Sequence, residues 1–570
     1  MTLEEDCRNR ILSEEYAAFI IEYHDDLPDL SAKYDFCFEI INATHAIAYT
    51  PIATLPNNLI HIFGYSIYPS VFGLLDITSV EASGIVRLRN IPALNLRGQG
   101  VLIGIIDTGI DYTHDAFKYA DGTSRILSLW DQTIESENSR PEGFNYGTEY
   151  TQFQLNLALA SANPLTVVPS VDENGHGTFL AGIAAGSRSE ENNFTGVVPD
   201  AEIVVVKLKP AKQFTRDFFM IPEGATCYQE NDIMLGVKYL TNISRKSVRP
   251  ISICIGFGTS QGAHDERGVL SSYLSDIADE NGVAVVIAAG NEGNRGHHYY
   301  GLVDKVSGYD TVELKVGPNE TGFSMELWGD APSTFSIDIL SPTGEYIPRV
   351  PARIGETREI QFIFEDTKIY LDYQVIETQT GDELILMRFR NPTEGIWRFR
   401  VYSSSDLDLN FNIWLPMNQF ISDTTYFTEP DPEYTLTSPG NTFIPIVVTA
   451  YDHTNDSLYI NASRGYTRTQ QISPSLAAPG VNIIGPTINN GYKLSTGTSI
   501  AAAHTAGVSA MLLEWGIARG NYTQLDSVEI KNFLIRGARR DPNVTYPNKE
   551  WGYGILDIYG SFASLRGEII

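Results

Sequence analysis

The chain has 570 residues, which is enough for three or four domains of ordinary size. Hydrophobic residues make up 43% of it and charged residues 19%, so packed cores are expected and a mainly disordered chain is excluded. The 70 acidic residues outnumber the 40 basic ones, and the net charge of −30 argues against a nucleic-acid partner and against docking on anionic lipid.

The cysteine content and the first residues of the chain indicate where in the cell the protein is expected. The four cysteines are too few for a disulfide framework, and none are paired at the close spacing of a zinc site. The first ten residues are acidic, with no basic stretch leading into an apolar one, so no secretory signal is predicted. The longest apolar runs, such as 283–289, are far shorter than the ~20 residues of a membrane span. We therefore expect synthesis in the cytoplasm and no membrane partner, with later packaging into another compartment left open.

Residues 1–80 read as a small α+β unit with strands at 16–23, 36–41 and 71–76. From about Gly84 the pattern changes to continuous apolar runs separated by helix-like stretches, which is typical of a parallel sheet with helices on both faces. The predicted strands are 101–107, 203–208, 251–255 and 283–289, and the predicted helices between them include 232–240 and 270–280.

Residues 302–440 alternate apolar and polar positions, which predicts strands with one buried face. In one example, Val312, Leu314 and Val316 alternate with charged residues, and turn signals separate this run from others like it. The segment is therefore expected to form an antiparallel β-sandwich inserted into the α/β unit. The α/β pattern resumes near Ile444 and ends with helices at about 501–515 and 527–534.

Three short segments contain the candidate catalytic residues. Asp107, in Asp-Thr-Gly-Ile-Asp, follows a buried strand, where active-site groups of open α/β sheets gather, although a capping role is the simpler alternative. His176, in Asn-Gly-His-Gly-Thr, stands between two glycines that a merely packed histidine does not need. Ser499, in Gly-Thr-Ser-Ile-Ala, opens an alanine-rich helix, where it could be only an N-cap. Together, in the order Asp, His, Ser, the segments indicate a nucleophilic triad.

These segments resemble the signature segments of the subtilisin-like serine proteases (subtilases). The resemblance covers about 84–302 and 444–565 and implies that Asp107, His176 and Ser499 form the triad, with Ser499 as nucleophile, His176 as general base and Asp107 orienting the imidazole. One departure is Ala503, where the family usually has proline four residues after the serine.

The same resemblance implies the remaining site residues. Asn291 corresponds to the family's oxyanion donor, with a simple turn residue as the alternative. One wall of the substrate site would be Cys254, Ile255 and Gly256, which pair with substrate backbone, and the opposite wall would be Ala288, Ala289 and Gly290. Cys254 is better explained as a small buried residue than as a nucleophile.

Several further stretches, such as Trp130-Asp131-Gln132-Thr133 and 550–554, resemble the Csp germination proteases of clostridial spores. This narrower resemblance implies a self-processing zymogen that activates a spore cortex hydrolase by limited proteolysis. The expected domains are a prodomain (1–80), the first part of a catalytic domain (81–301), a jelly-roll-like sandwich (302–440) and the second part of the catalytic domain (441–570). The expected cut lies between Leu75 and Gly84.

The leading hypothesis is thus a serine endopeptidase whose partners are a protein or peptide substrate and its own prodomain. A pseudoprotease or signalling scaffold, held silent by a retained prodomain, is the alternative from another class. The sandwich is expected to brace the catalytic domain, with a sugar-binding module as its alternative. No cofactor is expected and no metal ligand can be named, although the acidity and the family's habits leave calcium open.

Overall fold

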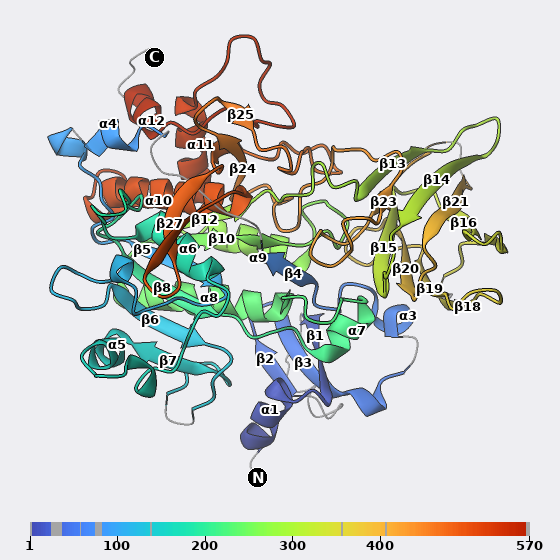
Figure 1. Cartoon of the computed structure of the whole chain (residues 1–570), viewed down its shortest axis with the longest axis horizontal. Helices are drawn as coiled ribbons and strands as arrows, with labels where there is room; N and C mark the ends of the chain where they lie inside the picture. Colours follow the sequence, from blue (N-terminus) through green and yellow to red (C-terminus); the bar gives the residue numbers. More distant parts are fainter. Residues whose placement is uncertain are drawn as a thin grey trace.

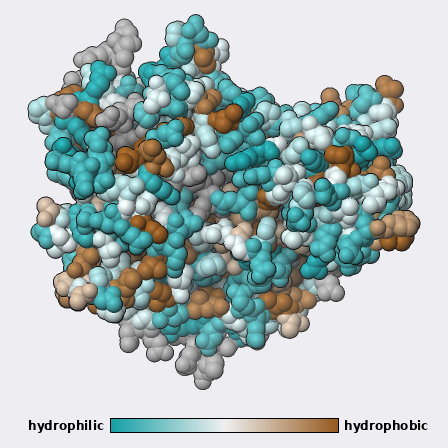
Figure 2. Space-filling view, viewed as in Figure 1, coloured by the Kyte–Doolittle hydropathy of each residue, from teal (hydrophilic) through white to brown (hydrophobic). Residues whose placement is uncertain are grey.

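The computed structural model describes residues 3–23, 37–56, 59–74, 83–89, 91–136, 139–354, 357–404, 407 and 409–565. Figure 1 shows a large α/β part, a group of strands extending to one side of it, and a smaller N-terminal part below. Figure 2 shows that this face of the molecule is mainly hydrophilic, with apolar side chains in small scattered groups. That surface fits the strong negative charge of the chain.

The N-terminal part contains a three-stranded antiparallel sheet in the order β1-β3-β2. Its elements are α1 (Leu3–Leu12), β1 (Tyr16–Glu22), β2 (Cys37–Ile40), β3 (His45–Pro51) and α3 (Leu59–Phe63). The predictions for 16–23 and 36–41 are confirmed in β1 and β2, whereas the central strand β3 was not predicted. The third predicted strand, 71–76, forms as β4 (Val71–Leu74) but does not join this sheet, and its last two residues lie outside the described part of the chain.

The α/β part is built on a nine-stranded sheet in the order β25-β24-β12-β10-β5-β8-β6-β7, with β26 also paired to β24. The strands are β5 (Leu102–Asp107), β6 (Ile126–Asp131), β7 (Thr148–Thr151), β8 (Glu202–Lys207), β10 (Ile251–Ile255), β12 (Val283–Ala288), β24 (Ile446–Asp452), β25 (Ser457–Leu458) and β26 (Leu476–Pro479). The inner strands pair in parallel, as their continuous apolar runs predict. The two edge strands β7 and β25 are antiparallel to their neighbours, so the sheet is mixed rather than purely parallel.

Helices cover both faces of this sheet (Figure 1). α6 (His176–Ala185) and α10 (Thr498–Leu513) pack on one face, and α8 (Glu230–Ser247) and α9 (Val269–Ala278) on the other. The smaller helices are α4 (Ile85–Arg89), α5 (Gln152–Leu159), α7 (Gln213–Phe218), α11 (Ser527–Gly537) and α12 (Ile558–Leu565). By length and composition the helical stretch Thr498–Ala518 could cross a membrane, but 89% of its apolar window is buried inside the protein, as in a core helix.

Two antiparallel sheets lie between β12 and β24 in the chain, with orders β13-β22-β15-β20-β19-β18 and β17-β16-β21-β14-β23. Their strands are β13 (His298–Leu302), β14 (Tyr309–Val316), β15 (Gly322–Gly329), β16 (Phe335–Leu340), β17 (Tyr346–Val350), β18 (Thr357–Gln361), β19 (Lys368–Gln374), β20 (Glu383–Arg390), β21 (Gly395–Ser403), β22 (Asn410–Trp414) and β23 (Tyr426–Phe427). The two sheets share one apolar core, to which Val312, Leu314 and Val316 contribute as their alternation predicts. We call this two-sheet unit the sandwich. A separate hairpin is formed by β27 (Ile483–Thr487) and β28 (Gly491–Ser495).

Candidate active site

Asp107 and His176 are joined by a short hydrogen bond in the interior of the α/β part. Asp107 is the last residue of β5 and is fully buried. Its Oδ1 accepts hydrogen bonds from Nδ1 of His176 at 2.7 Å and from the backbone N–H of Thr108 at 2.8 Å. The carboxylate therefore fixes which imidazole nitrogen carries the proton and leaves the other nitrogen for a reacting partner.

The glycines on both sides of His176 have distinct structural reasons. Gly175 has a φ of +87°, a conformation that glycine adopts at no steric cost, and it precedes the first residue of α6. A Cβ placed on Gly177 would lie 2.2 Å from the backbone oxygen of Gly109 and 3.1 Å from Cβ of Asp107. The helix that carries His176 can approach the Asp107 segment only because this position has no side chain.

Asp172 is a functional residue that the sequence analysis missed. Its Oδ1 accepts a hydrogen bond from the N–H of Gly175 at 2.8 Å, and its Oδ2 accepts one from the N–H of Thr178 at 3.0 Å. These bonds hold the turn that delivers His176 into the site. The signal available in the sequence was a carboxylate four residues before the histidine.

Ser499 and His176 both lie close to Gly256. Ser499 is the second residue of α10 and is fully buried. A Cβ placed on Gly256 would lie 3.3 Å from Cβ of Ser499 and 3.5 Å from Cε1 of His176. The three predicted segments therefore converge beside Gly256. α10 continues regularly through Ala503, so the missing proline does not interrupt the helix.

The first residue of the helix that carries Ser499 holds the Asn291 side chain by hydrogen bonds. Oδ1 of Asn291 accepts hydrogen bonds from the N–H of Thr498 at 3.2 Å and from the Thr498 hydroxyl at 3.1 Å. Because the carboxamide oxygen is held in this way, the NH₂ group is directed away from Thr498. The predicted oxyanion donor is thus held by the residue directly before Ser499.

The two predicted walls of the substrate site are the ends of adjacent parallel strands. Cys254 and Ile255 end β10, Ala288 ends β12, and the register pairs Ile255 with Ile287. Gly256 continues the first wall, and Ala289 and Gly290 continue the second, and all of these residues are buried. Burial raises the pKa of the Cys254 thiol well above its ordinary value, which disfavours a thiolate there.

Thr437, which the sequence analysis did not single out, lies between these walls. Its N–H donates a hydrogen bond to the backbone oxygen of Ala289 at 3.0 Å. A Cβ placed on Gly258 would lie 2.3 Å from Oγ1 of Thr437, and one placed on Gly290 would lie 2.6 Å from the same atom. The Thr437 side chain thus lies between Gly258 and Gly290, and a Cβ at either position would collide with it.

The strand β4 from the N-terminal part pairs with two strands of the α/β part beside this site. It is the central strand of a three-stranded antiparallel sheet between β11 (Phe257–Gly258) and β9 (Tyr228–Gln229). Leu74 pairs with Phe257, the residue directly after Gly256, and Phe72 pairs with Tyr228. The last described residue of β4 therefore lies next to the glycine that Ser499 and His176 approach.

Metal ligation has no candidate within the described ranges, where no three or more histidine, cysteine, aspartate or glutamate side chains are grouped to hold an ion. We accordingly assign no calcium ligands.

Comparison with known proteins identifies the family. The subtilase family model (peptidase S8) matches residues 98–312 and 425–554, and the unmatched segment between them contains most of the sandwich. The chain therefore belongs to the subtilase family of serine peptidases.

Individual relatives agree with this assignment. The chain is similar to the solved structure of the CspB protease of Clostridium perfringens, with 30% identity and a TM-score of 0.76 over 86% of this chain and 99% of that one. It is 21% identical over 529 residues to the PII-type proteinase of Lacticaseibacillus paracasei, covering 82% of this chain and 26% of that proteinase. It is 22% identical over 511 residues to the C5a peptidase of Streptococcus pyogenes, covering 81% of this chain and 40% of that peptidase. The chain thus spans well under half the length of these two curated relatives.

Proposed function

We propose that the protein is a serine endopeptidase of the subtilisin type in which Asp107, His176 and Ser499 are the catalytic triad and Asn291 is the oxyanion donor. The observation that carries the proposal is the 2.7 Å bond between Asp107 and His176, with Ser499 lying beside the same glycine as the imidazole. Membership of the subtilase family supports it.

In the proposed reaction, Oγ of Ser499 attacks the carbonyl carbon of the scissile bond while Nε2 of His176 takes the hydroxyl proton. Asp107 stabilises the imidazolium that forms, and Nδ2 of Asn291 donates a hydrogen bond to the developing oxyanion. His176 then passes the proton to the leaving amine, and a water molecule, activated in the same way, hydrolyses the acyl-enzyme.

The protein is proposed to be made as a zymogen whose prodomain is residues 1–80. The pairing of β4 between β11 and β9 supports this role, because a substrate segment paired in the same way would also lead to Ser499. The catalytic domain would then comprise 81–301 and 441–570, with the inserted sandwich at 302–440 as a brace. The proposed cut lies between Leu75 and Gly84, of which residues 75–82 lie outside the described part of the chain.

The test is N-terminal sequencing and intact mass of the purified full chain beside its Ser499→Ala variant. Wild-type protein is expected to show a new N-terminus within 75–84 and the variant only the original one. Identical uncut chains would contradict self-processing and would favour the alternative of a silent scaffold.

The substrate is proposed to be a spore cortex hydrolase precursor, with synthesis in the cytoplasm and packaging into spores. The support is the 30% identity to the CspB protease over nearly the whole of that chain. A sugar-binding role for the sandwich is less favoured, because its three tryptophans, Trp328, Trp397 and Trp414, are buried.

A buried carboxylate marks the contact between the proposed prodomain and the catalytic domain. Glu39 in β2 is 3% exposed, and Lys238 of α8 donates a hydrogen bond to the backbone of the same strand. Burial raises the pKa of Glu39 from 4.5 to about 7; Asp232 adds to the rise, while Lys238, the backbone of Asn145 and Lys209 oppose it.

Raising the pH is expected to loosen this contact. The pKa of Glu39 is higher in the folded chain than in the unfolded chain. The stability that neutral Glu39 contributes is therefore complete below pH 4.5 and is lost as the pH rises through about 7. The loss amounts to roughly 10²-fold in the equilibrium constant. In the uncut Ser499→Ala chain, Glu39→Gln is expected to flatten the fall in melting temperature between pH 5.5 and 8.5. Glu15→Gln, an exposed position in the same unit, is the control, and parallel curves for Glu39→Gln and its parent would contradict the expectation.

A further inference from the structure

The loop that follows β11 contacts the strand β4 through a side chain. Oε1 of Gln261 accepts a hydrogen bond from the backbone N–H of Val71 at 3.0 Å. Gln261 is 5% exposed, and its Nε2 is buried and has no hydrogen-bond partner among the described residues. A buried carboxamide therefore recognises the backbone of the bound strand three residues before Leu74.

A second side chain holds the preceding residue of that strand. The N–H of Ser70 donates a hydrogen bond to Oε2 of Glu230 at 3.1 Å, and the N–H of Glu230 donates to the oxygen of Ser70 at 3.0 Å. Phe72, between these contacts and Leu74, is fully buried and packs edge-on against Phe257 with ring centres 5.8 Å apart. The segment is thus held by its backbone at Ser70 and Val71 and by apolar contact of its side chain at Phe72.

The sandwich holds the loop that carries Gln261. The N–H of Gly262 donates a hydrogen bond to Oε2 of Glu326 in β15 at 2.9 Å. The imidazole of His264 stacks on Trp414 of β22 with ring centres 4.0 Å apart. Two successive parts of the loop are therefore anchored on strands of the inserted unit.

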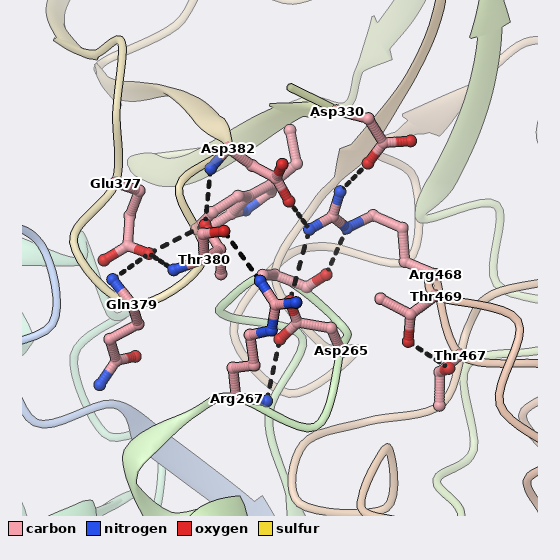
Figure 3. A network of polar contacts seen from close by, with 12 residues as sticks. Asp265, Arg267, Asp330, Glu377, Gln379, Thr380, Asp382, Thr467, Arg468 and Thr469 are labelled. Atoms are coloured by element: carbon pink, nitrogen blue, oxygen red, sulfur yellow. Dashed lines mark hydrogen bonds and ion pairs between the residues drawn. The ribbon is translucent and has the colours of Figure 1, made fainter. Parts of the chain in front are cut away.

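Arg468 provides the remaining anchor (Figure 3). Its Nε donates to the backbone oxygen of Ala263 at 2.8 Å, and its own N–H donates to the oxygen of His264 at 2.9 Å. The guanidinium is 3% exposed and faces three carboxylates, which belong to Asp265 of the loop and to Asp330 and Asp382 of the sandwich. One buried cation thus joins the loop to the sandwich, and its removal would leave the carboxylates without a counter-charge.

We propose that the loop 259–265 is an additional substrate subsite, which binds the backbone of an extended polypeptide segment upstream of the cleavage site. This inference rests on the proposed function and names its substrate class: an unfolded segment reaching back to the position of Ser70, with a large apolar residue at the position of Phe72. Gln261 and Glu230 bind the segment. Arg468 is a positioning residue, through which the sandwich keeps the loop in place.

The first test compares two peptides with the sequence of this chain, 69–84 and 73–84, as substrates of the processed enzyme. The longer peptide is expected to have about tenfold higher kcat/KM, mainly through a lower KM, since it alone gains the upstream contacts. Both peptides meet the same population of open sites, so their ratio is unaffected by any N-terminal fragment that stays bound. Equal kcat/KM values would overturn the subsite.

A second test isolates the Gln261 bond by a double-mutant cycle. Replacing the amide N–H of Val71 in the longer peptide by an ester oxygen is expected to lower kcat/KM about fivefold with the wild-type enzyme, the size of one hydrogen bond. With Gln261→Leu the amide and ester peptides should be cleaved equally. An ester effect that persists undiminished in the variant would contradict direct recognition by Gln261.

The positioning role is tested with Arg468→Lys, which keeps the charge but loses the planar fork. It is expected to reduce the ratio between the two peptides from about tenfold to below threefold, with Asp382→Asn reducing it in the same direction if Arg468→Lys does not fold. The control is Arg464→Lys, four residues before Arg468. The Arg464 side chain pairs with Glu550 at the surface, so this variant should leave the ratio unchanged. A ratio unchanged in Arg468→Lys or Asp382→Asn would contradict the role of the sandwich.

A fluorophosphonate probe keeps this inference separate from the proposed function, because the probe reacts with Ser499 without any contact to the upstream subsite. Labelled enzyme that cleaves both peptides equally contradicts only the subsite. Failure to label Ser499 contradicts the proposed peptidase activity itself.

Discussion

Replacing His176 by alanine is expected to lower kcat for peptide hydrolysis by about 10⁶-fold, the size known for loss of the serine or histidine of the triad in subtilisin. The reason is that Ser499 would have no base to take its proton, while the Asp107 carboxylate would remain buried without its 2.7 Å partner. The measurement is single-turnover hydrolysis of the peptide 69–84 under saturating enzyme, so that chemistry is observed rather than binding.

His453→Ala is the matched control, since this histidine lies on the loop after β24, away from the three convergent segments. Its kcat is expected to stay within about twofold of the wild-type value. A loss smaller than about 10³-fold in His176→Ala, in protein with the wild-type melting temperature, would contradict the assignment of His176 as general base.

The second large effect is expected at Asp107. Asp107→Asn preserves the shape of the side chain but removes its charge, and it allows an NH₂ group to face the imidazole. The imidazole would then favour the wrong tautomer, and its charged form would lose its counter-ion, for an expected fall in kcat of about 10⁴-fold, as for the same exchange in a chymotrypsin-like enzyme. The measurement is the same single-turnover assay.

Asp111→Asn provides the comparison within one segment. Oδ1 of Asp111 accepts a hydrogen bond from the hydroxyl of Thr113 at 2.6 Å, and Oδ2 accepts one from the N–H of Asn489, neither of which involves the imidazole. We expect a change in kcat of less than about fivefold. Similar losses in the Asp107 and Asp111 variants would point to a shared structural role and against the proposed triad.

The parts of the fold that could be predicted from sequence are those in which the residues of one short segment determine its structure. The inner strands β5, β8, β10 and β12 are continuous apolar runs because both of their faces are buried, so each was predicted within one or two residues of its observed bounds. The glycines on both sides of His176 set this histidine apart in the sequence, and each of them has a structural reason in the fold.

The parts that could not be predicted depend on pairing between distant residues. The edge strands β7 and β25 have no buried run of their own and exist through their partners β6 and β24. The strand β4 has an ordinary apolar sequence, and nothing local indicates that it pairs with β9 and β11 rather than with its nearest strands.

The same limit applies within the site. Thr437 is separated from Gly258 and Gly290 by the whole of the sandwich, and its position between the two walls arises only when the chain returns. Arg468 and its three carboxylates are likewise brought together from four separate places in the chain. Such contacts are properties of the topology, which residue type and spacing in a single sequence do not reveal.

The neighbouring strands β12 and β24 have a consequence for how the protein folds. They pair in parallel although about 150 residues separate them, and a flexible loop of that length would make the closure of the sheet entropically costly. The sandwich shortens this loop, because its first strand β13 pairs with β22, near its end, and so brings the entering and leaving chains together. We therefore expect the sandwich to close before β24 pairs with β12. Mutations that slow closure of the sandwich are therefore expected to delay completion of the central sheet, even where they leave the stability of the finished protein unchanged.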